Sequence, residues 1–63
     1  MRCTSINVCK HGNFQIDHFG SKNDCYSRFE DWCITNDPIW SKLFDVRTGE
    51  LVATYGSSGL MIR

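Results

Sequence analysis

The sequence predicts a small α+β domain with the element order ββαββ, in which two hairpins form an antiparallel sheet and one helix packs on one face of it. Three observations predict this fold. Apolar residues alternate with a period of two between residues 3 and 19, on either side of a His-Gly-Asn turn. They recur at spacings of three and four in residues 21–35, which is the period of an amphipathic helix. The period of two then returns in residues 39–55.

The first hairpin is expected in residues 3–19, with a three-residue turn at His11-Gly12-Asn13. Asparagine tolerates the left-handed conformation that such a turn needs, and the turn places Val8 opposite Ile16. This register gathers one apolar face, which we expect to receive the helix: Ile6, Val8, Phe14 and Ile16. The opposite face then carries Cys3, Ser5, Asn7 and Cys9. A turn of two or four residues would instead group Cys9 with the apolar residues and mix the two faces.

A helix is expected to begin near Ser21 and to run to about Thr35. Ser21 or Asn23 can cap its N-terminus, and Asp24 in the first turn complements the positive end of the helix dipole. The apolar residues form one stripe that we expect to face the sheet: Cys25, Tyr26, Phe29, Trp32 and Cys33. Pro38 ends the helix, because proline has no N–H to donate and keeps the preceding residue out of the helical conformation.

Residues 39–55 carry the clearest hairpin signal. Gly49 stands where a type I turn with a bulge favours a left-handed residue, and this turn predicts that Phe44 lies opposite Val52. We expect residues 1–56 to form the single ββαββ domain. Residues 57–63 are expected to be either a flexible C-terminal tail or a short edge strand.

Both faces of the second hairpin are apolar, yet a single helix can cover only one face of a four-stranded sheet. The C-terminal tail or the twist of the sheet can cover the second face, or another chain can. A chain of 63 residues builds a small core and gains much from association, so we take another chain as the leading hypothesis. The predicted partner-binding residues are the apolar Trp40, Phe44, Val46 and Val52, with the cations Lys42 and Arg47 at the rim.

Four cysteines and two histidines raise the question of a zinc site or a disulfide framework. Structural zinc sites use close pairs such as Cys-x2-4-Cys, whereas Cys3-x5-Cys9 and Cys25-x7-Cys33 are wider. A small zinc-binding domain is therefore only a third alternative, and we expect no bound metal. The predicted register sets Cys3 and Cys9 on the far side of the sheet from the helix, so four reduced thiols are expected, with Cys25 and Cys33 in the core and the other two more exposed.

No residue pattern indicates an enzyme, and we expect no catalytic residues and no cofactor. Asp17 and His18 are adjacent on a strand and therefore point to opposite faces. Cys9 and His11 are close enough to act together, but a domain of this size has no room for a deep pocket that excludes water. The sequence contains neither a P-loop nor a dinucleotide-binding fingerprint.

Seven basic and seven acidic residues give a net charge of zero, which argues against attraction to nucleic acid or to an anionic membrane. Trp40, Lys42 and Phe44 nevertheless share a face suited to stacking bases, so a single-stranded nucleic-acid-binding module is the alternative function. The N-terminus lacks the apolar core of a secretory signal, no run approaches the roughly 18 residues of a membrane span, and we expect a cytoplasmic location.

The leading hypothesis is a small cytoplasmic protein-interaction module. It would act as a homodimer, or as a regulator or inhibitor that binds a host protein. Phages and mobile elements carry many proteins of this size and style, and the comparison is one of analogy.

Overall fold

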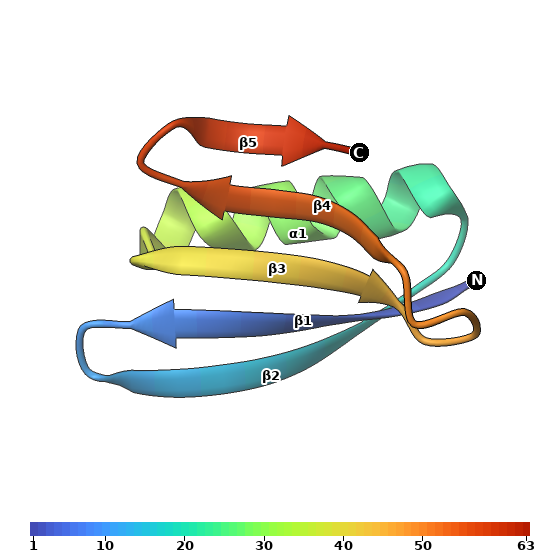
Figure 1. Ribbon diagram of the computed structural model, residues 1–63, viewed down its shortest axis with the longest axis horizontal. Helices are drawn as coiled ribbons and strands as arrows, with labels where there is room; N and C mark the ends of the chain where they lie inside the picture. The colour runs from blue at the N-terminus through green and yellow to red at the C-terminus, as the bar shows by residue number, and fades with distance from the viewer.

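The computed structural model of the protein covers residues 1–63 and contains five strands and one helix (Figure 1). In chain order the elements are β1 (Arg2–Cys9), β2 (Gly12–Phe19), α1 (Lys22–Asn36), β3 (Trp40–Asp45), β4 (Leu51–Gly56) and β5 (Gly59–Ile62). The strands form one antiparallel sheet in the order β2-β1-β3-β4-β5, and α1 lies on one face, behind the sheet in Figure 1. The predicted α+β class is confirmed. The C-terminal segment adds a fifth strand, β5, at the edge of the sheet.

α1 begins where the sequence indicates because Ser21 and Asp24 form a capping box. The Ser21 hydroxyl oxygen accepts a hydrogen bond from the Asp24 backbone N–H at 3.1 Å, and the Asp24 carboxylate accepts one from the Ser21 backbone N–H at 3.0 Å. These bonds from Ser21 hold the pKa of Asp24 below its usual value. Asp37 adopts the left-handed conformation and donates its N–H to the Cys33 carbonyl at 2.8 Å, which ends the helix before Pro38.

The first hairpin has a different register from the predicted one. Its turn contains two residues, Lys10-His11, and Val8 pairs with Asn13 instead of Ile16. The physical reason is that Gly12, not Asn13, takes the unusual backbone conformation, with φ at 147°. The predicted assignment of faces is therefore wrong for β1, whereas Phe14 and Ile16 of β2 lie on the helix side as predicted. The helix covers Cys3, Ser5 and Asn7, while Ile6 and Val8 lie on the opposite face.

The second hairpin has the predicted left-handed glycine, with φ at 76° for Gly49. A β-bulge follows, because the pairing of β3 with β4 shifts by one residue between Leu43 and Phe44. Phe44 consequently lies opposite Leu51, and the predicted pairing of Phe44 with Val52 is wrong. Because the bulge adds one residue to β4, Val52 joins the core and is only 8% exposed.

The core lies between α1 and the sheet, and Phe29 is its largest fully buried side chain. Its members are Cys3, Cys25, Phe29, Cys33, Leu43, Val52 and Ala53. The predicted helix stripe is confirmed, because three of its residues belong to this core and Tyr26 and Trp32 pack against it. Directly beneath the helix the strands supply small residues, including Ser5 and Ser41, which leave room for the phenyl ring.

Candidate protein-interaction surface

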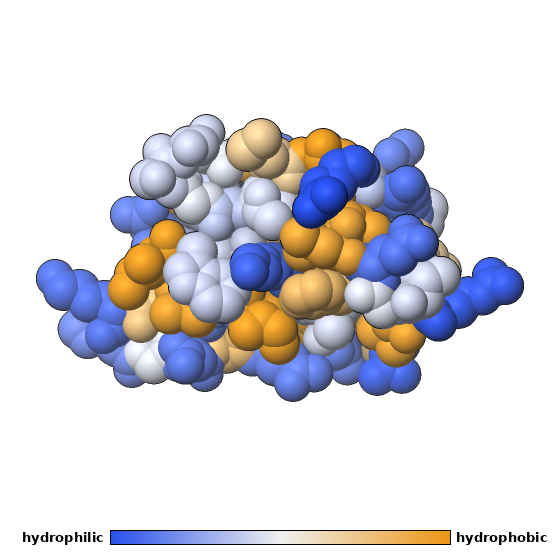
Figure 2. Space-filling model, viewed as in Figure 1, coloured by the Kyte–Doolittle hydropathy of each residue, from blue (hydrophilic) through white to orange (hydrophobic).

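The face of the sheet opposite α1 has no covering element in this chain (Figure 1), and we call it the open sheet face. Side chains alternate along a strand and antiparallel partners share a face, so the strand register identifies its members. They are Thr4, Ile6 and Val8 from β1; Trp40, Lys42 and Phe44 from β3; Leu51 and Thr54 from β4; Met61 from β5; and Asn13, Gln15, Asp17 and Phe19 from β2. Figure 2 shows apolar groups across the middle of this face, interrupted by polar ones.

Trp40 and Phe44 project from β3, which is the central strand of the sheet. Trp40 is 37% exposed and pairs with Val8, while Phe44 is half-buried. Lys42 lies between them and pairs with Ile6. Its ammonium nitrogen is 5.1 Å from the centroid of the Trp40 ring, a cation–π distance. Aromatic, cationic and aliphatic side chains therefore meet at the centre of the open sheet face.

The remaining predicted partner-binding residues lie elsewhere. Val46, which is 43% exposed, and Arg47 belong to the turn between β3 and β4, at the end of the open sheet face. They line a shallow hollow of about 490 Å³ together with Met1, Arg2 and Asp45. The prediction that Val52 shares the surface with Trp40 is wrong, because the bulge places it in the core.

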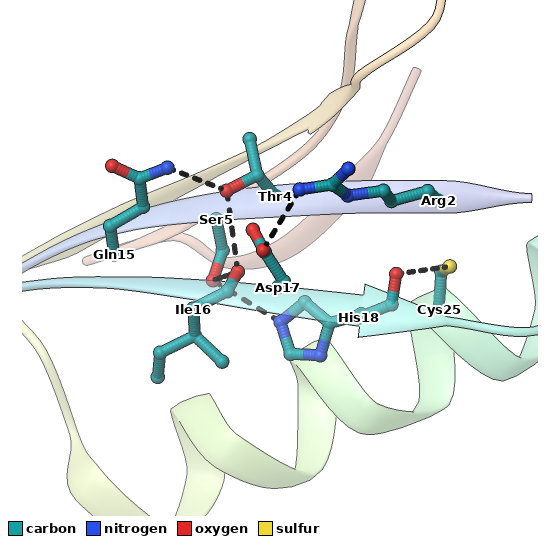
Figure 3. A network of polar contacts seen from close by, with 8 residues as sticks. All are labelled: Arg2, Thr4, Ser5, Gln15, Ile16, Asp17, His18 and Cys25. Carbon is teal, nitrogen blue, oxygen red and sulfur yellow. Dashed lines mark hydrogen bonds and ion pairs between the residues drawn. The ribbon is translucent and has the colours of Figure 1, made fainter.

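Polar side chains of β1 and β2 form one rim of the open sheet face (Figure 3). Arg2 donates to the Asp17 carboxylate at 3.2 Å, and Gln15 donates to the Thr4 hydroxyl at 3.3 Å. Hydrogen bonds from Thr4 and then from Arg2 lower the pKa of Asp17. The Arg2 guanidinium also stacks near the ring of Phe19, at 5.7 Å from its centroid. This rim is exposed and carries an ion pair, whereas aromatic and aliphatic side chains surround the one cation, Lys42, at the centre of the face.

Beneath α1 the structure contains a buried polar cluster of Ser5, Asn7 and His18 that the predicted register does not indicate. Figure 3 shows its Ser5–His18 contact. The Ser5 hydroxyl lies 3.2 Å from His18 Nε2, and the Asn7 amide donates to the same hydroxyl at 2.9 Å. Burial, and next the positive charge of Arg28, lower the pKa of His18. The sequence signal that could have revealed this cluster is the alternative of a two-residue turn in the first hairpin. That turn places Ser5, Asn7 and His18 together on the helix side.

The Ser5–His18 pair resembles the start of a nucleophile–base arrangement, but the geometry does not support that chemistry. Ser5 is 1% exposed and His18 is 5% exposed, so neither reaches a substrate. Asp17, as its strand position predicts, points to the other face and pairs with Arg2. The pair is a structural hydrogen bond in the core.

All four cysteines are free thiols. Cys25 and Cys33 lie in the core as expected, and Cys9 is half-buried. The prediction that Cys3 is exposed on the far side of the sheet is wrong. It is fully buried next to Cys25, and burial followed by this neighbouring thiol raises the pKa of Cys3 to about 12.

No group of three or more His, Cys, Asp and Glu side chains has a geometry that could hold a metal ion, so the zinc-binding alternative has no ligand set here. No helix is long and apolar enough to cross a membrane. Comparisons of the chain with protein-family models, with curated proteins and with solved structures find no match. The open sheet face is therefore interpreted from its own chemistry.

Proposed function

We propose that this protein is an interaction module that binds a partner protein through the open sheet face. The observation that carries the proposal is the position of Trp40 and Phe44. Both project from the central strand onto the one broad face that α1 leaves uncovered. Ile6, Val8 and Leu51 surround them with aliphatic surface.

The chemistry of this face matches that of an interface centre. Binding energy at protein interfaces is concentrated in a few aromatic and cationic anchors near the centre, surrounded by polar residues that exclude water. Here Trp40 and Phe44 are the anchors, and the Arg2–Asp17 pair stands at the rim. Lys42 would gain a carboxylate partner on the bound protein, because it lies beside the Trp40 ring and forms no ion pair within this chain.

A contact-acting regulator or inhibitor of a host protein is the role that this arrangement serves best. The free thiols and the absence of a metal-ligand set leave the fold dependent on its small core alone. Burying the open sheet face against a partner would stabilise the domain by mass action. The proposed place of action is the cytoplasm, where reduced thiols persist.

The test compares two matched variants. Trp40→Ser combined with Phe44→Ser removes both anchors, whereas Ile34→Ser removes an exposed apolar residue of α1, 65% exposed, that lies outside the open sheet face. Each protein is immobilised and incubated with lysate of its native host, and circular dichroism verifies that the helix is intact. A partner retained by the wild type and by Ile34→Ser should be absent from the double variant. Equal retention by the double variant would refute the proposed surface.

Single-stranded nucleic acid is a second candidate ligand, and the Lys42–Trp40 contact favours it, because a cation beside an exposed aromatic ring suits a stacked base and its phosphate. The net charge of zero makes a protein partner the better fit. Anisotropy of a labelled oligonucleotide separates the two. Binding that weakens steeply with added salt would support nucleic acid, and no binding at low salt would eliminate it.

A further inference from the structure

β2 is an edge strand that leaves part of its backbone unpaired. It spans eight residues and pairs only with β1, and no element lies beyond it in Figure 1. The Gly20 N–H donates to the Met1 carbonyl at 3.1 Å, which fixes the phase of the ladder. Even-numbered residues of β2 therefore turn their N–H and C=O groups toward β1, and odd-numbered residues turn theirs outward. Arg28 already donates to the outward carbonyl of Phe19, at 2.6 Å.

Three residues remain with both backbone groups facing outward: Asn13, Gln15 and Asp17. Natural edge strands usually carry a lysine, a proline, a bulge or a very short length that prevents pairing with another chain. β2 contains none of these. Its one charged residue, Asp17, is drawn inward to Arg2 on β1. The opposite edge, β5, has four residues and is protected by its shortness.

We infer that the protein forms a homodimer in which β2 pairs antiparallel with β2 of a second copy. A two-fold axis at Gln15 sets this residue opposite the partner's Gln15. Asn13 then lies opposite the partner's Asp17, and Asp17 opposite the partner's Asn13. Every outward N–H and C=O of these residues obtains a hydrogen bond across the interface.

The side chains are complementary in this register. On the helix side, Phe14 faces the partner's Ile16, and Ile16 faces the partner's Phe14. Phe14 is 51% exposed in the single chain and Ile16 is half-buried, so both gain apolar contact. No like charges stand opposite each other, and the net charge of zero imposes no repulsion between copies.

Shifted registers are worse. An axis at Asp17 sets two carboxylates directly opposite each other, which is destabilising. An axis at Ile16 directs Asn13 to the partner's Phe19, whose carbonyl is occupied by Arg28. An axis at Phe14 leaves Asp17 beyond the end of the partner strand. The sequence of β2 thus favours a second copy in one register.

The dimer uses the β2 edge and leaves the open sheet face free, so it is independent of the proposed function. The two sheets become continuous through the β2–β2 pair, with both helices on the same side and both open faces on the other. A partner protein that is itself two-fold symmetric would meet two copies of the Trp40–Phe44 centre side by side.

Light scattering over a range of protein concentration provides the test. The wild type should have the mass of two chains at high concentration. Gln15→Pro should have the mass of one, because it removes an outward N–H that the β1–β2 ladder does not use. Gln15→Thr is the matched control, since it also loses the bond to Thr4 but keeps the backbone donor, and it should stay dimeric. Phe14→Glu, a change at an exposed position, should also give single chains.

Amide hydrogen exchange gives a readout at the level of single residues. The N–H groups of Asn13, Gln15 and Asp17 should exchange slowly in concentrated wild type and quickly on dilution or in Phe14→Glu. A wild type with the mass of one chain at all concentrations would overturn the inference. So would a dimer that both Gln15→Pro and Phe14→Glu leave intact. Trp40→Ser with Phe44→Ser should stay dimeric, so failure of the dimer and failure of the proposed function are distinguishable.

Discussion

Acidification should destabilise this fold through His18. The ring is 5% exposed, and it packs edge-on to Phe29 with 6.5 Å between ring centroids. Burial and Arg28 lower its pKa from 6.5 in the folded chain, and Asp17 opposes them only in part. Protonation in place would put a positive charge in the core beside Phe29, where the neutral Ser5 hydroxyl at 3.2 Å is the only side-chain partner and no carboxylate forms an ion pair with the ring.

The sign follows from linkage. The unfolded chain binds a proton at His18 near pH 6.5, whereas the folded chain binds it only at a lower pH. Unfolding therefore takes up a proton at pH values between the folded and the unfolded pKa of His18. The contribution of neutral His18 to the free energy of unfolding is fully present above pH 6.5 and is lost as the pH falls below it. One proton gives a slope of at most about 1.4 kcal/mol per pH unit. A domain of this size has only a few kcal/mol of stability to lose.

Urea unfolding between about pH 7.5 and pH 5 measures this slope. The carboxyl groups of Asp17 and Asp24 do not interfere, because their pKa values lie below 3.8. His18→Gln should flatten the profile, whereas His11→Gln, at the exposed turn, should leave it unchanged. A flat wild-type profile, or a slope that survives in His18→Gln, would refute the reasoning.

Three further predictions concern the helix and the core. Ser21→Ala should cost about 1 kcal/mol and lower the Tm by roughly 4–8 °C, measured by circular dichroism, because it removes the capping box; Ser21→Asn should recover most of the loss. Phe29→Ala should cost about 3–5 kcal/mol and leave the chain largely unfolded at 25 °C, and a cooperative native-like thermal transition would contradict that expectation. Iodoacetamide at neutral pH should label Cys9 first, with Cys3 labelled only in denaturant; mass spectrometry of the native protein that finds Cys3 modified as fast as Cys9 would show that the core opens readily.

Local signals in the sequence predict the elements that local chemistry controls. Ser21, Asp24 and Pro38 determine where the helix begins and ends, because they act on backbone groups within one turn. Gly49 marks the second turn for a similar reason, since few other residues adopt its backbone angle readily. The common face of Trp40, Lys42 and Phe44 follows from the period of two in one strand.

The strand partners and the face that meets the helix are decided by the tertiary structure. A period of two states which residues of β1 share a face, but either face can meet α1, and the apolar pair Ile6 and Val8 suggested the wrong one. The helix brings a large side chain, Phe29, and the β1 face that carries the smaller residues Cys3 and Ser5 is the one buried beneath it. A bulge of one residue likewise moves Val52 from the surface to the core.

The sequence by itself therefore determined the α+β class, the approximate limits of the helix, the second turn and the aromatic pair on β3. The tertiary structure decided the order of the strands, the burial of Cys3, Ser5 and His18, and the exposure of the β2 edge. The physical reason is the range of the interactions. Caps and turns are formed by residues that are neighbours in the chain. Strand order and the choice of the buried face depend on packing between segments far apart in sequence, where side-chain volumes decide between arrangements that fit the local sequence equally well.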